Sequence, residues 1–303
     1  MYSTVGLIKY SKHSGKLIGA HQRLDRAART FFSKIAPKNL AFPTYKEIVH
    51  FEGMQGPDGL KRKSPGKDEP MHFIIPDQDD GRLIRMISDH QYNLKKALAT
   101  TDKSQTPNLQ RAAFEAAWLA HALTDGLTPA HHFPYAEAVK DLMSDKDYYT
   151  IFGQPVKGIM RGDTFLTAAK NNWKYWGVEG LMTKHIVFEY RVALILAAMP
   201  YKKLSPNLDI SEQQKLSDYG NLDLEAEFYA ALKRINGLKM YDRFREDGWS
   251  RELARETKEI LLPEIVKIIT IGWLSSLPSN EQQSSKGALP IPSRKSRSST
   301  PKE

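Results

Sequence analysis

Apolar side chains recur at intervals of three and four residues through most long segments of this chain. This spacing places them on one face of an α-helix, whereas a half-buried β-strand alternates apolar and polar residues, a pattern that is nearly absent here. The periodicity therefore predicts an all-α fold. Helices are expected over the ranges 16–36, 80–100, 108–127, 163–176, 178–199, 210–236 and 250–277.

The expected helices belong to one multi-helix domain over 16–277, with long loops between some of them. A length of 303 residues would also allow two domains, but the chain shows no internal repeat. Residues 1–15 are expected to form a short N-terminal segment. Residues 278–303 are rich in Ser and Pro and carry more basic than acidic side chains, which is typical of a disordered basic tail.

The chain contains no cysteine and nine histidines. The lack of cysteine excludes disulfides, thiolate nucleophiles, iron–sulfur clusters and cysteine-based zinc sites. A metal site in this protein must therefore be built from histidine, aspartate and glutamate. The formal net charge of +9 favours anionic partners such as phospholipid surfaces, nucleic acid or phosphorylated metabolites.

The first residues lack the apolar stretch and the small-residue cleavage site of a secretory signal. The most apolar segments are too short, or too often interrupted by charged residues, to span a bilayer. We therefore expect a cytoplasmic protein without a transmembrane helix. A misplaced start codon that hides a signal peptide would instead make the protein secreted or surface-associated.

Two histidine–carboxylate pairs stand four residues apart within apolar helical segments, His121 with Asp125 and His185 with Glu189. Residues at this spacing project from the same face of a helix and can share one metal ion. His131 follows the first pair across a Pro-containing turn. Each pair alone is also explained by a buried histidine bonded to its carboxylate, but two such pairs and a trailing histidine favour a metal centre with more than one ion.

A Gly- and Pro-rich stretch from 42 to 76 supplies two further candidates, Asp58 and His72. Loops of this length are usually functional or disordered. Asp58, between Pro57 and Gly59, is equally typical of an ordinary turn. His21 opens the first long helix, where an exposed polar residue is the alternative.

The order of these residues resembles the zinc-dependent phospholipase C family and its relatives, the zinc nucleases that cleave single-stranded nucleic acid. The specific pieces are His121-x-x-x-Asp125, followed by Thr-Pro-Ala-His131, and the later His185-x-x-x-Glu189. A glutamate at the last position is similar to the phospholipase branch, because the nuclease branch usually carries aspartate there.

The resemblance implies an all-α enzyme with three zinc ions in a cleft. Residue by residue, it implies a first zinc held by Asp58, His72, His121 and Asp125, a second held by His131, His185 and Glu189, and a third held by His21 and bridged by Asp125. In the family the third ion also binds an N-terminal Trp. This chain begins Met1-Tyr2, so two Zn²⁺ ions are expected and the third site departs from the family pattern.

The activity implied by this resemblance is that of a metal-dependent phosphodiesterase, a hydrolase of the phospholipase C type that cleaves glycerophospholipids with zinc-activated water. Asp58 is the candidate catalytic base, because a loop carboxylate has more freedom than one fixed on a helix. The alternatives are a single-strand nuclease or 3′-nucleotidase of the same superfamily, and a metal-binding helical protein without activity.

The expected partner is a phospholipid headgroup or a membrane surface, with single-stranded nucleic acid as the alternative and no obligate protein partner. Three neighbouring aromatic residues, Trp173, Tyr175 and Trp176, are compatible with a lipid interface, with stacking on a base or with ordinary core packing.

Overall fold

The computed structural model describes residues 19–38, 40–52, 56–57, 73–76, 81–100, 106–140, 142, 160 and 162–278. Regular structure within these ranges is helical throughout and includes no strand, so the predicted all-α class is confirmed. None of these helices combines the length and apolar composition needed to cross a membrane. The expected division into 1–15, 16–277 and 278–303 stays a prediction, because nearly all of the two terminal segments lies outside the described residues.

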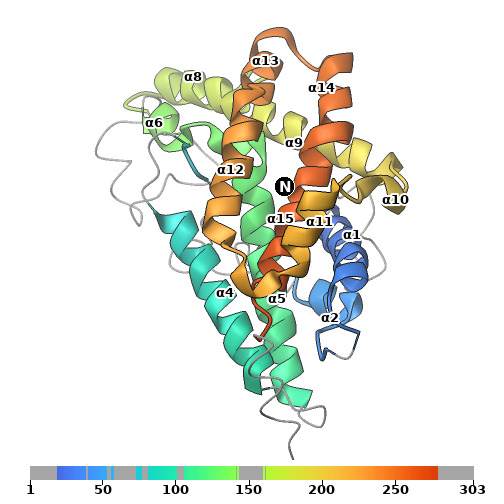
Figure 1. The fold of residues 1–303 in the computed structure, drawn as a ribbon. Helices are drawn as coiled ribbons and strands as arrows, with labels where there is room; N and C mark the ends of the chain where they lie inside the picture. The colour runs from blue at the N-terminus through green and yellow to red at the C-terminus, as the bar shows by residue number, and fades with distance from the viewer. Residues whose placement is uncertain are drawn as a thin grey trace, which may run out of the picture.

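Helix α5 (Thr106–Leu127) occupies the centre of the molecule, as Figure 1 shows. Helix α4 (Arg82–Thr100) packs along one side of it and α15 (Leu262–Leu274) along another, with α1 (Ala20–Ile35) against α15. Fully buried alanines at 112, 113, 116, 117, 120 and 122 keep α5 narrow, so its neighbours approach closely. A Cβ added at Gly272 of α15 would lie 2.9 Å from Cδ1 of Leu123, which shows how tight this contact is.

A polar contact also ties α15 to α5. The indole Nε1 of Trp273 donates a hydrogen bond of 3.0 Å to the carbonyl of Ala116, and the side chain of Trp273 is fully buried. A buried tryptophan needs such an acceptor for its only donor. The contact therefore sets how α15 sits along the central helix.

The upper part of Figure 1 holds α9 (Leu181–Ala198), which packs against α1, and α8 (Phe165–Trp176), which packs against α9. Helices α13 (Met240–Asp247) and α14 (Arg251–Glu256) lie in the same region, and α12 (Leu224–Gly237), which leads up to α13, packs on α5 and α15. The described chain also includes four shorter helical elements: α6 (Tyr135–Lys140), α10 (Tyr201–Leu204), α11 (Ile210–Ser217) and the 3₁₀ turn η2 (Tyr219–Asn221).

The helix expected over 210–236 is divided into α11, η2 and α12. Asp223 ends the interruption, because its side chain accepts a hydrogen bond from the backbone N–H of Ala226 and caps α12. The helix expected over 250–277 is continuous but contains a π-helical turn, η3 (Thr257–Leu261), just before Pro263. Pro263 has no N–H to donate to the preceding turn, and its ring crowds the carbonyl groups there. The wider π-helical turn gives the ring room.

Helix α2 (Tyr45–His50) lies within the stretch that the sequence pattern assigned to a loop. The side chain of Thr44 accepts from the N–H of Glu47, and the carboxylate of Glu47 accepts from the N–H of Thr44. This reciprocal capping stabilises a helix too short for apolar periodicity to reveal. Helix α2 packs on α1 and α5 and delivers the buried residue Glu52 directly after its end.

Candidate metal centre

Helix α5 places His121 and Asp125 one turn apart in the interior, where they are 0% and 1% exposed. The helix ends at Leu127, and the 3₁₀ turn η1 (Pro129–His132) brings His131 back beside it. The N–H of His131 donates to the carbonyl of Thr128, whose hydroxyl donates to the carbonyl of Thr124. These bonds fix the turn and with it the position of the His131 ring.

The first group consists of His21 from α1 with His121 and Asp125 from α5. Nε2 of His21 lies 3.3 Å from Oδ1 of Asp125, and Nε2 of His121 lies 3.2 Å from Oδ2. The two imidazole rings are stacked almost parallel, with centroids 4.0 Å apart and an angle of 9°. Both rings therefore present the same edge to the same carboxylate.

The second group consists of His131 from η1 with His185 and Glu189 from α9. Oε1 of Glu189 lies 2.8 Å from Nε2 of His131 and 3.5 Å from Nε2 of His185. The two rings are again stacked, with centroids 5.2 Å apart and an angle of 19°. All three side chains are buried.

Asp125 links the two groups, because its Oδ2 also lies 3.9 Å from Nδ1 of His131. Burial by itself would raise the pKa of Asp125, but surrounding positive charges, including His131, His121 and His21, lower it well below the usual value. The pKa of Glu189 is also lowered against the effect of burial, by positive charges that include His185 and by hydrogen bonds from both histidines. Both carboxylates are thus ionised and suited to bind cations.

The spacing of the donor atoms fits metal coordination. Two ligands of a tetrahedral zinc ion, each about 2.0–2.2 Å from the metal, lie roughly 3.3–3.6 Å apart. The separations of His21 and His121 from Asp125 (3.3 and 3.2 Å) and of His185 from Glu189 (3.5 Å) are close to this range. The 2.8 Å between His131 and Glu189 is a hydrogen-bond distance that a bound ion would widen. Each group could therefore hold one metal ion.

Two further buried carboxylates, Asp25 and Glu52, stand beside the first group, and the sequence pattern did not single them out. They are 1% and 0% exposed, and within the described residues neither forms an ion pair with Lys or Arg. Burial, with the negative charge of Glu52, raises the pKa of Asp25 well above its usual value. Burying acidic groups at this depth is costly even where they contact histidines, as Glu52 does, and a divalent cation nearby would offset part of that cost.

Glu52 contacts both histidines of the first group on the side opposite Asp125. Nδ1 of His121 donates to its Oε1 at 2.6 Å, and Nδ1 of His21 lies 3.4 Å from the same oxygen. A carboxylate only accepts, so the hydrogen of His121 is held on Nδ1 and the Nε2 edge is directed at Asp125. An outer carboxylate of this kind orients an imidazole for metal binding.

Of the candidate site residues, the structure brings together His21, His121, Asp125, His131, His185 and Glu189. Asp58 and His72 lie outside the described residues, so their expected roles as first-site ligands, and that of Asp58 as base, stay predictions. The half-buried His132 hydrogen-bonds the carbonyl of Gly126 and belongs to neither group. The sequence contains one indication that Asp25 belongs to the site, because it stands four residues after His21, the same spacing as in the other two pairs. It contains no such indication for Glu52, which lies in a stretch assigned to a loop.

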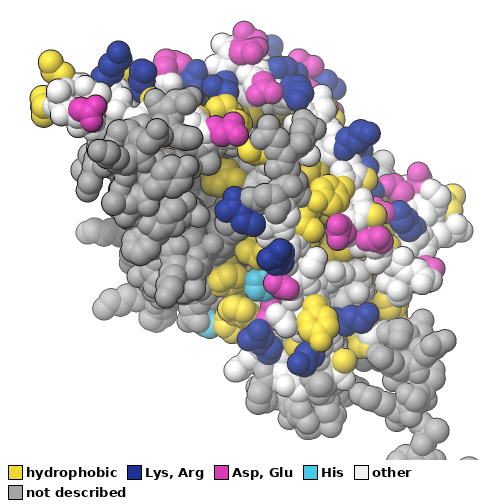
Figure 2. All heavy atoms as spheres, turned by 90° about the vertical axis from the view of Figure 1, so that its left-hand side faces the viewer, with side chains coloured by type: hydrophobic (Ala, Val, Ile, Leu, Met, Phe, Trp, Pro, Cys, Tyr) yellow, Lys and Arg dark blue, Asp and Glu magenta, His cyan; other side chains and the backbone are white. Residues whose placement is uncertain are grey.

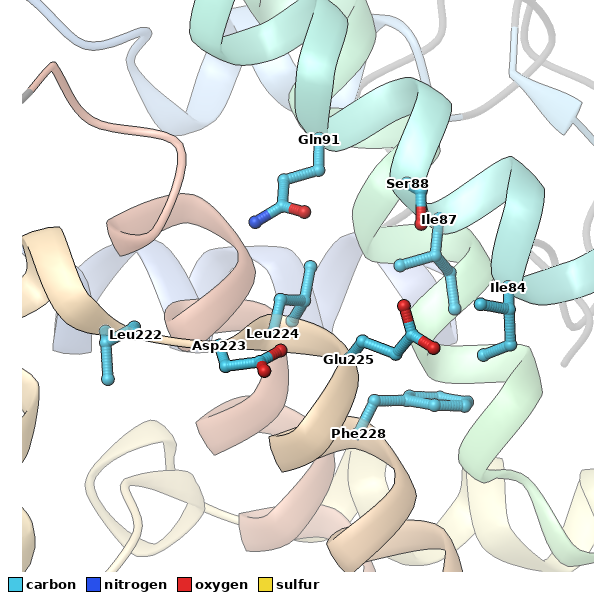
Figure 3. Close-up of a pocket in the computed structure, with 9 residues that line it drawn as sticks. All are labelled: Ile84, Ile87, Ser88, Gln91, Leu222, Asp223, Leu224, Glu225 and Phe228. Atoms are coloured by element: carbon cyan, nitrogen blue, oxygen red, sulfur yellow. The ribbon is translucent and has the colours of Figure 1, made fainter.

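A separate pocket lies between α4 and the start of α12 (Figure 3). Its lining consists of Ile84, Ile87, Ser88, Gln91, Leu222, Asp223, Leu224, Glu225 and Phe228, and so includes no residue of either metal-binding group. One of its two carboxylates, Asp223, is already engaged as the cap of α12. The pocket therefore adds nothing to the metal centre.

No protein-family model, no curated protein and no solved structure matches this chain. The likeness to zinc-dependent phospholipases C consequently depends on the order of the residues and on the geometry described above. That geometry, a helical protein with two buried groups able to bind metal, is compatible with a zinc-dependent helical enzyme.

Proposed function

We propose that this protein is a metal-dependent phosphodiesterase that hydrolyses glycerophospholipids in the manner of a phospholipase C. The observation that carries the proposal is the pair of adjacent buried nitrogen and oxygen triads joined through Asp125. Imidazole and carboxylate donors suit zinc, and two neighbouring zinc ions supply Lewis-acid activation of a phosphodiester and of the attacking water. The order of the residues and the glutamate at position 189 favour the phospholipase branch.

In this proposal each residue has a defined task. His121 and Asp125 hold one ion together with His21, which the family resemblance had assigned to a third site. His131, His185 and Glu189 hold the other ion. Glu52 keeps the Nε2 edges of two imidazoles turned toward Asp125. Asp58 accepts the proton of the water that attacks phosphorus.

A single-strand nuclease or 3′-nucleotidase is the second candidate, because the net charge of +9 also suits a polynucleotide. On the face drawn in Figure 2, Lys and Arg side chains are interspersed with Asp and Glu and do not form one continuous basic track.

The test combines metal analysis with parallel turnover assays on phosphatidylcholine micelles and on single-stranded DNA. We expect bound zinc, release of diacylglycerol and a phosphorylated headgroup, and loss of both zinc and turnover in the His185→Ala variant. His50→Ala serves as the matched control, because His50 is exposed at the end of α2.

Four results would contradict all or part of the proposal. Purified protein without any bound metal would remove the catalytic function altogether. Bound zinc with turnover of DNA alone would identify the nuclease, and bound zinc without turnover of either substrate would identify an inactive metal-binding protein. An Asp58→Asn variant with full metal content and near-normal turnover would remove Asp58 as the base.

A further inference from the structure

The exposed side of α8 is unusually apolar for a surface helix. Phe165, Leu166 and Trp173 are 86%, 78% and 70% exposed, and Trp176 is 43% exposed. At 100° per residue, these four side chains and the exposed Ala169 fall within one sector of about 100°. Large apolar residues gathered on one exposed stripe mark a site of interaction rather than ordinary surface scatter.

A neighbouring side of α8 packs into the protein. Tyr175 is 6% exposed and belongs to a small core cluster with Val139 and Met160, and the side chain of Asn172 bonds both the N–H and the carbonyl of Met160. The three aromatic residues that the sequence left unassigned therefore have different roles. Tyr175 is a core residue, whereas Trp173 and Trp176 face outward.

Cationic side chains border the apolar stripe. Lys170 and Lys174 are exposed and follow the stripe on one flank of the helix, and α8 itself contains no acidic residue. A helix with Trp, Phe and Leu on one face and Lys beside it is the form that lies in the headgroup region of a bilayer. Anionic lipid complements its charge, and tryptophan is favoured at that depth.

We propose that this stripe, formed by Phe165, Leu166, Trp173 and Trp176 and bordered by Lys170 and Lys174, is a docking surface for an anionic phospholipid membrane. The inference rests on the proposed function for its lipid substrate. Helix α8 packs directly on α9, which carries His185 and Glu189 of the second metal-binding group. Docking through α8 therefore holds the metal centre at the surface from which its substrate is drawn.

The experiment measures co-sedimentation of the full chain with vesicles of phosphatidylcholine containing phosphatidylserine. The Phe165→Ala/Trp173→Ala variant is expected to reduce partitioning at least tenfold, because each ring removes the transfer of a large apolar side chain out of water. The Lys170→Gln/Lys174→Gln variant is expected to reduce it about fivefold per lysine, and only when phosphatidylserine is present. All of these side chains are exposed, so circular dichroism should confirm an unchanged fold.

Tyr92→Ala provides the matched control, because Tyr92 is an exposed aromatic (67%) on α4, away from α8 in Figure 1. Wild-type binding by this variant is the expected result. Equal vesicle binding by the wild type and the Phe165→Ala/Trp173→Ala variant would overturn the docking surface. A second result would also overturn it: light scattering shows that the wild type is a dimer, and the double variant is a monomer that still binds vesicles. The stripe would then pair two copies of the chain.

Turnover separates this inference from the proposed function. If both hold, the Phe165→Ala/Trp173→Ala variant hydrolyses a short-chain phosphatidylcholine below its critical micelle concentration as the wild type does, but loses activity on vesicles. Vesicle binding that depends on the stripe, in a protein that hydrolyses neither substrate, would support docking and refute the proposed activity. Normal hydrolysis of vesicles by the double variant would refute docking and leave the proposed activity standing.

Discussion

Nδ1 of His121 lies 2.6 Å from Oε1 of Glu52, a contact between the central helix α5 and the turn that follows α2. Both side chains are fully buried. Burial would lower the pKa of His121, but Glu52 first and Asp125 second raise it well above its usual value. The same oxygen of Glu52 lies 3.4 Å from Nδ1 of His21, so one carboxylate stands behind both imidazoles of the first metal-binding group.

We predict that Glu52→Gln weakens zinc binding at the first group by 10- to 100-fold, the range usual for loss of an outer-sphere carboxylate. The charge that holds the His121 hydrogen on Nδ1 would be lost while the shape of the side chain is kept. Titration against a chromophoric chelator measures the affinity. The control is Glu179→Gln, which changes a carboxylate that is 80% exposed and should leave the zinc affinity unchanged. An unchanged zinc affinity in Glu52→Gln as well would show that Glu52 is only a packing residue.

Asp125 contacts histidines of both metal-binding groups, whereas Glu189 belongs to the second group alone. Replacing each carboxylate should therefore change the number of bound metal ions differently. Asp125→Asn is expected to reduce metal content at both groups, because Asp125 contacts His21, His121 and His131. Glu189→Gln should remove the metal of the second group alone, because its ion pairs within the described residues are with His131 and His185. Metal analysis after dialysis checks both; an equal loss in the two variants would show that Asp125 does not link the groups.

Chelation should destabilise the folded protein. Metal that binds only the native state stabilises it by about 4 kcal/mol when the free metal is a thousandfold above its Kd. In a chain of this size that corresponds to a fall in Tm of roughly 10 °C on adding EDTA, reversed by adding zinc. Scanning calorimetry with and without chelator measures the change. An identical Tm in both states would argue against metal binding at buried groups.

Acid should weaken the metal-free protein through His132. Burial is the main reason why its pKa falls to about 4 in the folded state. The unfolded chain therefore takes up the proton first as pH falls, and stability contributed by the neutral ring is lost between about pH 6.5 and pH 4. Because the ring is only half-buried, the loss should be on the order of 1–2 kcal/mol.

Urea unfolding of the apoprotein at a series of pH values measures this dependence. His132→Gln should flatten it, because an amide carries no titrating proton and can still donate to the carbonyl of Gly126. The same slope in wild type and variant would assign the acid sensitivity to other groups.

The helical segments were predictable because apolar periodicity records which face of each helix is buried. It identified α4, α5, α8 and α9 to within a few residues. It overlooked α2, which depends on capping by Thr44 and Glu47, and it did not anticipate the break before Asp223 or the π turn before Pro263. These features depend on individual hydrogen bonds and on one missing donor, which a spacing pattern does not contain.

The sequence by itself determined the all-α class and the donor chemistry, because helical spacing and a complete absence of cysteine leave only imidazole and carboxylate ligands. It also paired His121 with Asp125 and His185 with Glu189, since a four-residue step fixes two side chains on one helical face. Only the tertiary structure placed His21 against His121, inserted Glu52 behind both rings and left the stripe on α8 exposed. Those relationships join residues far apart in the chain, and packing between helices, rather than spacing within one, brings them together.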